Sequence, residues 1–314
     1  MDVAGKLIPE TDMLDDHTRK RIRAIWEMGR LHTHEAWLSV FPAVWGASIG
    51  AKSDRTDVWS FALVLFGIWA SATVSHTAFC TWNDICDVEY DRQVERCKSR
   101  PLPSGLISVK EATFVFLCWI LLTLGTTWYT LGPQATLCTT PAWLLSLVYP
   151  FMKRIMPFPQ LVVGLSVASG VMPGYVTVRG DIEFNGSVLA LFGATVCWII
   201  FLDTAYAVQD MVDDVKCGVQ SLAVFLGQRV RVFLALAAVV TITFFVEAVF
   251  MSRLSLFYWT FGIGVWVAGM IRSVSLLDLS DCASGGRVFR FNIKAGFYLT
   301  VVTFVEGYLQ AWFY

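Results

Sequence analysis

Long apolar blocks alternate with shorter polar connections along the chain, and there are nine of these blocks. Most are close to the roughly 20 residues that an α-helix needs to cross a bilayer, and the first and fourth are the shortest. Apolar and polar residues do not alternate within them, as they would in membrane β-strands. Because lipid offers no hydrogen bonds to the backbone, we expect each block to be an α-helix. The predicted spans are residues 36–51, 58–80, 112–131, 134–150, 159–178, 187–208, 230–250, 254–271 and 295–313.

The composition agrees with this pattern. The 314 residues are 56% hydrophobic and only 16% charged, with a mean hydropathy of +0.59, whereas a soluble domain carries about a quarter charged residues. The chain is therefore predicted to be an all-α integral membrane protein in contact with the lipid bilayer. The net charge of −1 provides no basic field for nucleic acid. Eight cysteines form no CxxC pair, so we expect neither a disulfide framework nor a zinc site.

The distribution of basic residues predicts the orientation. Twenty of the 24 Lys and Arg residues belong to the N-terminal segment and to the connections after the second, fourth, sixth and eighth spans. This asymmetry places those parts, including a segment over residues 1–30, in the cytosol. Residues 1–30 contain several acids and no apolar stretch, which disfavours a signal or mitochondrial import sequence. For a eukaryotic protein we expect an endomembrane, the endoplasmic reticulum or Golgi, with the acidic clusters facing the cytosol.

A first acidic cluster follows the second span. Asp84, Asp87 and Asp91 are three and four residues apart, which places their carboxylates on one face of a continuing helix. Like charges on one face repel each other unless a cation lies between them. Hard oxygen ligands suit Mg²⁺, which completes its coordination with phosphate oxygens and water, so the cluster predicts a diphosphate ligand.

A second acidic cluster follows the sixth span and begins about 126 residues after the first. Asp203, Tyr206, Asp210 and Asp214 share one helical face, and Asp213 lies beside them. Asp203 is the closest to the membrane, where an ionisable residue is a functional candidate. Both clusters fall on the same predicted side of the membrane, which suggests an internal duplication of a helix followed by an acidic loop.

Basic residues flank both clusters. Guanidinium and ammonium groups can hold the diphosphate oxygens and neutralise the leaving group. The candidates are Arg92, Arg96, Lys98 and Arg100 after the first cluster, Lys153 and Arg154 after the fourth span, and Lys216 after the second cluster.

Three stretches resemble motifs of the UbiA superfamily of intramembrane prenyltransferases. They are Asn83-Asp84-x-x-Asp87-x-x-x-Asp91 with the Arg96-x-Lys98-x-Arg100-Pro101 stretch, Tyr149-Pro150-x-x-Lys153-Arg154, and Tyr206-Ala-x-Gln209-Asp210-x-x-Asp213-Asp214. The resemblance implies a single domain over residues 1–314, with nine transmembrane helices around a central cavity. It also implies two Mg²⁺ ions that bridge aspartates to a polyprenyl diphosphate, and cation chemistry inside the membrane.

The same resemblance implies roles for individual residues. The implied metal ligands are Asp84, Asp87, Asp91, Asp210, Asp213 and Asp214, and all of them except Asp213 are implied to be catalytic. The implied substrate-binding residues are Asn83, Arg96, Lys98, Arg100, Lys153, Arg154, Tyr206 and Lys216. One region departs from the family pattern: Arg30-Leu-His32-Thr-His34-Glu35 stands where many members that prenylate aromatic acceptors have a Lys-Pro-x-Gly-Thr-like stretch.

The leading hypothesis for function is transfer of a prenyl group, from farnesyl diphosphate, to an aromatic or polyketide-type acceptor in terpenoid biosynthesis. The departure near residue 30 keeps a membrane-bound terpene cyclase as the alternative. A transporter would explain the helices but not the arginine-rich loop.

Residue type and position indicate some weaker candidates. A prenyl cation needs a dry cavity whose aromatic faces stabilise it without attacking it. Trp82, Trp119, Trp143 and Trp198 are candidates for this role. His76 and Glu306 could also face the cavity, although a satisfied buried histidine is the simpler interpretation of His76.

Overall fold

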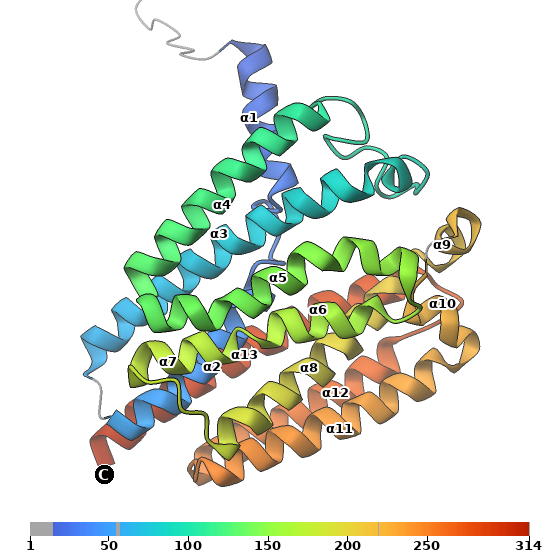
Figure 1. The fold of residues 1–314 in the computed structure, drawn as a ribbon. Helices are drawn as coiled ribbons and strands as arrows, with labels where there is room; N and C mark the ends of the chain where they lie inside the picture. The colour runs from blue at the N-terminus through green and yellow to red at the C-terminus, as the bar shows by residue number, and fades with distance from the viewer. Residues whose placement is uncertain (1–14, 55–56, 219, 314) are drawn as a thin grey trace, which may run out of the picture.

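The described part of the computed structural model, residues 15–54, 57–218 and 220–313, is helical and contains no β-strand (Figure 1). The first 14 residues of the predicted cytosolic segment lie outside this part. The helices are α1 (Asp16–Met28), α2 (Trp37–Asp54), α3 (Val58–Asp91), α4 (Val109–Leu131), α5 (Pro133–Ile155), α6 (Pro159–Ala168), α7 (Val171–Arg179), α8 (Gly186–Ala207), α9 (Met211–Cys217), α10 (Leu222–Leu226), the 3₁₀ turn η1 (Gly227–Arg229), α11 (Val230–Met251), the π-helix η2 (Tyr258–Gly264), α12 (Val265–Leu276) and α13 (Ala283–Phe313).

The structure agrees approximately with the predicted number of nine membrane spans. Eight helical segments of the described chain are long and apolar enough to cross a bilayer, and the first predicted span, Trp37–Ala51, is a shorter apolar helix. The structure also shifts several boundaries. The second span continues to Asp91 in one helix, so the first acidic cluster is helical throughout. The fifth span is interrupted at Ser169–Gly170, because Pro173 has no N–H with which to bond the carbonyl of Ser169.

Glycines allow two of the central helices to approach each other closely. A side chain at Gly46 in α2 would collide with the backbone of Val171 at the start of α7, and one at Gly174 in α7 would collide with that of Ala43. Small residues at such crossings are typical of helix pairs in membranes, where close packing replaces the hydrophobic effect as the driving force.

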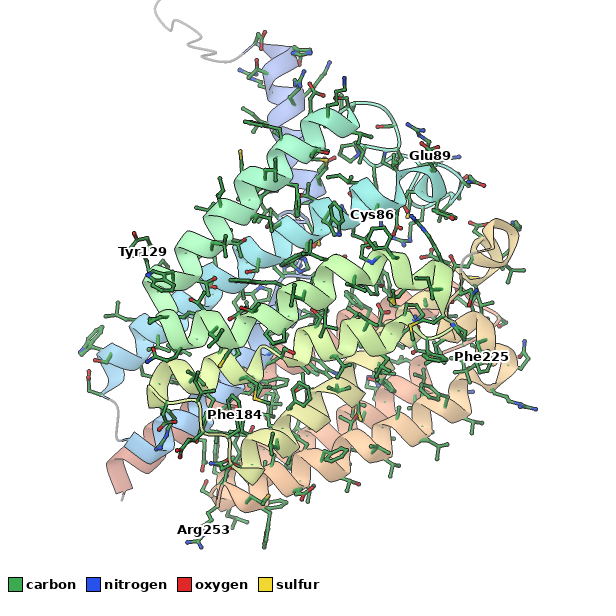
Figure 2. The ribbon with its side chains drawn as sticks, in the orientation of Figure 1. Cys86, Glu89, Tyr129, Phe184, Phe225 and Arg253 are labelled. Atoms are coloured by element: carbon green, nitrogen blue, oxygen red, sulfur yellow. The ribbon has the colours of Figure 1, made fainter. Side chains whose placement is uncertain are left out.

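The outer surface of the bundle is apolar. Large side chains on α4 and α11 point away from the protein, including Leu121, Tyr129 and Phe250, which are all at least 70% exposed. Figure 2 shows Tyr129 projecting outward from its helix. An apolar outer surface of this extent is unfavourable in water, so it supports the predicted contact with lipid.

Both acidic clusters lie at one end of the bundle. The end of α3 and the short helix α9 lie toward the same end, with Arg253 at the opposite end (Figures 1 and 2). Helix α1 packs over the α3–α4 connection, where Ala24 and Met28 contact Leu102 and Ile107. A capping box between Ser108 and Glu111 fixes the start of α4, so the basic loop between α3 and α4 is anchored at both ends.

Candidate active site

A cavity of about 530 Å³ lies inside the bundle and connects the two acidic motifs. Its wall includes side chains from α3, α5, α6 and α8 and from the segment between α1 and α2. The acids on this wall are Glu35, Asp87, Asp91, Asp203, Asp210 and Asp214. The arginines are Arg30, Arg96, Arg100 and Arg154.

The first motif presents a different face to the cavity than the sequence predicted. Asn83, Asp87 and Asp91, spaced four residues apart, line the cavity, whereas Asp84 is completely buried and does not. The prediction that Asp84, Asp87 and Asp91 share the functional face was therefore wrong for Asp84. The physical reason is that Asp84 points toward Arg30, which lies between it and the cavity.

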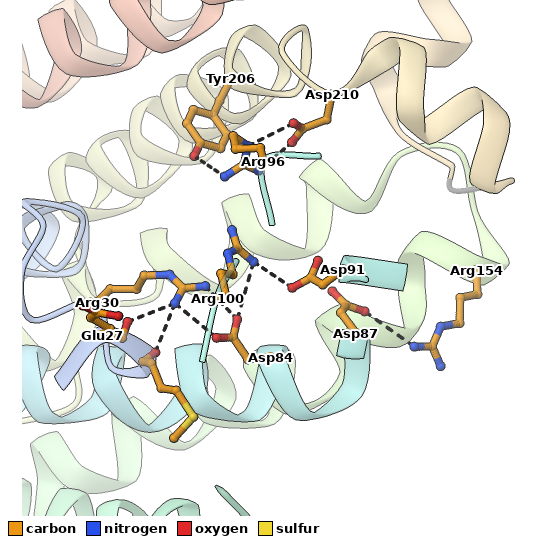
Figure 3. A network of polar contacts seen from close by, with 11 residues as sticks. Glu27, Arg30, Asp84, Asp87, Asp91, Arg96, Arg100, Arg154, Tyr206 and Asp210 are labelled. Atoms are coloured by element: carbon orange, nitrogen blue, oxygen red, sulfur yellow. Dashed lines mark hydrogen bonds and ion pairs between the residues drawn. The ribbon is translucent and has the colours of Figure 1, made fainter. Parts of the chain in front are cut away.

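Arg30 forms a two-pronged ion pair with Asp84. Its Nη2 donates to Oδ1 at 2.7 Å and its Nη1 to Oδ2 at 3.2 Å (Figure 3). Burial alone would lower the pKa of Arg30, but the charge of Asp84 outweighs it and the pKa is raised. Arg30 adopts a left-handed backbone, with φ of 56°, a conformation that costs free energy in a non-glycine residue. Sequence reasoning missed this residue, although it opens the stretch that departs from the family pattern.

The other two aspartates of the first motif also face arginines. Arg100 Nη1 donates to Asp91 at 2.8 Å and lies 3.6 Å from Asp84. Arg154 lies 3.5 Å from Asp87, and its guanidinium stacks on the ring of Tyr90, with 4.9 Å between the guanidinium carbon and the ring centre. These contacts bring two predicted arginines, one from the loop after α3 and one from the last turn of α5, to the same row of carboxylates.

The second motif lies where α8 ends and α9 begins. The helix stops at Ala207, so these residues do not lie on one continuous helix, yet Asp203, Tyr206, Asp210 and Asp214 all line the cavity. Arg96, from the loop after α3, binds Asp210 through Nε at 3.0 Å and Nη2 at 2.7 Å. Its Nη1 also donates to the Tyr206 hydroxyl at 3.3 Å (Figure 3). Burial would lower the pKa of Arg96, but the hydrogen bonds to Asp210 raise it above its ordinary value.

Two of the predicted basic residues, Lys98 and Lys216, lie away from the cavity wall. Lys98 pairs with Glu95 at 2.6 Å, and Lys216 pairs with Asp213 at 3.1 Å, each within its own turn. The hydrogen bond from Lys216 lowers the pKa of Asp213. Lys153 lies near the end of α5, and its side chain is outside the described part of the structure. Arg92, also away from the cavity, binds Glu89.

The donors on the cavity wall fit a magnesium–diphosphate ligand. Carboxylate and amide oxygens are the hard ligands that Mg²⁺ prefers, and the buried Oδ1 of Asn83 has no hydrogen-bond partner within the described residues. In that same part of the chain no three His, Cys, Asp or Glu side chains are already grouped as a metal cage. Mg²⁺ commonly takes only one or two carboxylates and completes its coordination with phosphate oxygens and water, so a preformed cage is not required.

The aromatic wall differs from the prediction. Of the four candidate tryptophans, Trp143 lines the cavity, whereas Trp82 donates to the Leu147 carbonyl at 2.9 Å and Trp198 belongs to an internal aromatic cluster with Trp45. Trp119 is also absent from the wall. Sequence could not separate these roles, because a tryptophan in a membrane helix suits a core, a lipid interface or a cavity equally well.

The two weaker polar candidates, His76 and Glu306, lie in different parts of the structure. His76 lines the cavity, and its Nε2 lies 3.3 Å from the Cys80 sulfur. Glu306 instead binds the backbone N–H and hydroxyl of Ser255, at 2.7 and 2.5 Å, near the other end of the bundle. The carboxylate of Glu306 thus ties α13 to the start of the η2 segment.

Comparison with known proteins agrees with this fold and site. The profile of the UbiA prenyltransferase family matches residues 39–297. The chain is 48% identical over 290 residues to polyprenyl transferase macG of Penicillium terrestre, with 92% of this chain and 91% of that protein covered. It is 46% identical to polyprenyl transferase yanG of Aspergillus niger, with 90% of each chain covered. The protein therefore belongs to the UbiA prenyltransferase family, and the predicted family and enzyme class are confirmed.

Solved structures show the same fold at lower sequence identity. A UbiA homologue from Aeropyrum pernix superimposes with a TM-score of 0.72 at 20% identity, covering 85% of this chain and 97% of that one. A homologue from Archaeoglobus fulgidus, described as bound to GPP and Mg²⁺, has a TM-score of 0.65 at 18% identity, covering 88% and 99%. These likenesses confirm the predicted UbiA-like helical fold.

Proposed function

We propose that the protein ionises a polyprenyl diphosphate, farnesyl diphosphate, with the help of Mg²⁺ and transfers the prenyl group to an aromatic or polyketide-type acceptor. The observation that carries this proposal is the meeting of both acidic motifs and four arginines on the wall of one cavity in a membrane-embedded bundle. The homologue described with bound GPP and Mg²⁺ supports the choice of metal and ligand class.

The aspartates and Asn83 are the groups that would hold Mg²⁺. Asn83, Asp87 and Asp91 would hold one ion on the α3 side, and Asp210 and Asp214 a second on the α8–α9 side. When bound, Mg²⁺ would draw charge from the leaving diphosphate. Asp213, although predicted as a ligand, points at Lys216 and is assigned a supporting role. Asp84 is assigned the task of holding Arg30 and Arg100 in place.

The arginines on the cavity wall would hold the diphosphate. Guanidinium groups match phosphate oxygens in pairs. Arg96 and Arg100 approach the cavity from the loop after α3, and Arg154 approaches it from the last turn of α5. Each now engages an aspartate, so diphosphate would share or take over these donors while Mg²⁺ took over the carboxylates. Lys98 and Lys216 would contribute at longer range, as cations beside the two acidic motifs.

The remainder of the cavity suits a short prenyl chain. Its volume lies within the range of roughly 300–1,000 Å³ that is usual for sites enclosing a small-molecule ligand. Phe79, Trp143 and Phe289 supply aromatic wall surface. Apolar and aromatic surroundings exclude water, which would otherwise quench an allylic cation. These features favour a farnesyl-sized donor together with a small acceptor.

We also propose an endomembrane location, in the endoplasmic reticulum or Golgi, with the cavity opening toward the cytosol. The basic end of the bundle carries both motifs, and basic connections are retained on the cytosolic side. A fluorescent fusion that co-localised with mitochondria would contradict this location.

The proposed reaction is tested by product analysis with purified protein. Geranyl, farnesyl and geranylgeranyl diphosphate are each incubated with Mg²⁺, with and without a phenolic acceptor, and with EDTA as the control. The proposal expects a prenylated acceptor, highest with farnesyl diphosphate, and no product with EDTA. A cyclic hydrocarbon formed from farnesyl diphosphate and Mg²⁺ alone would instead establish the terpene cyclase alternative.

A further inference from the structure

Glu35 is an acid on the cavity wall that the proposed metal and diphosphate sites do not use. It lies in the short segment between α1 and α2 and is half-buried. The backbone N–H of Glu35 donates to the Thr33 hydroxyl. Among the described residues, its carboxylate makes neither a hydrogen bond nor an ion pair. By contrast, Asp87, Asp91 and Asp210 each face an arginine.

The surroundings of Glu35 leave its charge uncompensated. Arg30 is within electrostatic range, but its guanidinium is bonded on both prongs to Asp84. His76 and Cys80 are also within range, and they contact each other at 3.3 Å. A partly buried carboxylate gains stability from a hydrogen-bond donor, and a molecule bound in the cavity would supply that donor in place of solvent.

We propose that Glu35 recognises the prenyl acceptor, that the acceptor is a neutral phenol, and that Glu35 takes the proton of its hydroxyl. This inference rests on the proposed transferase function. A phenolic hydroxyl supplies the donor that Glu35 lacks, and the ring of His76 flanks the same part of the wall. A ring carboxylate on the acceptor would bring a second negative charge toward Glu35, and the repulsion between the two costs binding free energy.

Besides Mg²⁺, the proposed transfer needs only Glu35, the phenolic acceptor and the prenyl diphosphate. The acceptor O–H proton moves to Glu35, and the electrons released into the ring form the new C–C bond to the first carbon of the prenyl chain. The C–O bond of the prenyl diphosphate breaks, and its electron pair leaves with diphosphate. The ring then loses its C–H proton, which departs with the diphosphate, and Glu35 returns the first proton to the phenolic oxygen.

The position of Glu35 in the sequence supports this assignment. It lies in the Arg30–Glu35 stretch, where the chain departs from the pattern of many family members that prenylate aromatic acceptors. The departure carries both Arg30, which is committed to Asp84, and the unpaired Glu35.

The test compares two acceptors that differ by one carboxylate, resorcinol and β-resorcylic acid, with farnesyl diphosphate as donor. Wild-type protein is expected to prefer resorcinol by at least about tenfold in kcat/KM. Glu35→Gln should lower the rate with resorcinol at least about tenfold and reduce the preference to within a few fold. The KM for farnesyl diphosphate should change by less than about twofold, because diphosphate binding is left intact. Glu183→Gln, an exposed acid away from the cavity, is the matched control and should behave as wild type.

The outcomes separate this inference from the proposed function. If wild type prenylates phenols but Glu35→Gln keeps both the rate and the preference, the role of Glu35 is overturned and the transferase function stands. Equal use of the two acceptors by wild type would also overturn the inference. If wild type releases diphosphate but prenylates no phenol, the proposed transferase function fails, and the inference fails with it.

Discussion

Pairs of arginine and aspartate determine the charge balance of the cavity wall, and they differ in burial. Asp84 and Asp87 are both buried, but their partners differ: the Arg30 side chain is 12% exposed, whereas that of Arg154 is 35% exposed. A buried charge left without its partner costs about 3–5 kcal/mol, whereas a partly exposed one is hydrated by water and costs less. The two aspartates should therefore respond differently to the same substitution.

We expect Asp84→Ala and Asp87→Ala both to lower turnover by about 10²-fold or more, but only Asp84→Ala to lose substantial stability. The first leaves Arg30 buried and unpaired, and the second removes a group that faces the substrate. Diphosphate release measures turnover, and thermal unfolding in detergent measures stability. Asp210→Ala should follow Asp87→Ala. Equal melting temperatures for the Asp84 and Asp87 variants, or near-normal turnover in two of the three, would contradict these assignments.

Sequence reasoning singled out most of the acids on the cavity wall and three of its four arginines, Arg96, Arg100 and Arg154. The acidic motifs could be found because helical spacing places carboxylates on a face that only a cation makes favourable. Arg30 could not, because its partner Asp84 is 54 positions away and no local pattern links the two. Asp84 was misplaced for a related reason: spacings of three and four residues cannot decide which of Asn83 and Asp84 turns toward the cavity.

At the scale of elements, the loop between α3 and α4 joins the two motifs. Arg100 binds Asp91 at the end of α3, and Arg96 reaches Asp210 beside α9. Cys97 lies between these arginines and is only 3% exposed. Burial raises the pKa of its thiol to about 11, so at pH 8 almost none of it is the reactive thiolate.

Cys97 should therefore resist alkylation by iodoacetamide at pH 8 while the exposed Cys282 reacts. Because the folded-state pKa is raised, the neutral thiol persists until the pH approaches about 11, and reactivity should rise toward that value. Arg96→Ala should release the loop and speed labelling of Cys97 at least about tenfold. Mass spectrometry of the labelled protein measures both sites. Rapid labelling of Cys97 in wild type at pH 8 would contradict the closed loop.

Element boundaries show what hydropathy can and cannot reveal. The apolar blocks predicted the helices that cross the membrane, because the apolar content needed for a span is a property of the local sequence. The extension of α3 to Asp91 was invisible to hydropathy, since its last turns carry acids that pair with arginines outside the helix. Only the spacing of those acids, three and four residues, indicated that the helix continues. The break between α6 and α7 had a local cue in Pro173, yet whether a proline bends or interrupts a helix depends on its neighbours in space.

At the scale of the whole molecule, the asymmetry of basic residues predicts that the end carrying both motifs faces the cytosol. Ser104 lies exposed in the loop after α3, and Glu183 lies exposed between α7 and α8. In a variant whose exposed Cys118 and Cys282 are replaced by serine, Ser104→Cys should react with an impermeant maleimide only from the cytosolic side of sealed vesicles. Glu183→Cys should react only from the opposite side. The reverse pattern would contradict the orientation.

The central claim is that both acidic motifs hold Mg²⁺ against one prenyl diphosphate in the shared cavity. Its most direct test is a crystal structure with the unreactive analogue farnesyl S-thiolodiphosphate and Mn²⁺, located by anomalous scattering. The account predicts Mn²⁺ between the diphosphate and oxygens of Asp87 or Asp91 on one side and Asp210 or Asp214 on the other, at about 2.1 Å, the distance expected for the Mg²⁺ it replaces. It also predicts that Arg96 and Arg154 bind the diphosphate. Diphosphate bound without metal, with the arginine–aspartate pairs intact, would contradict it.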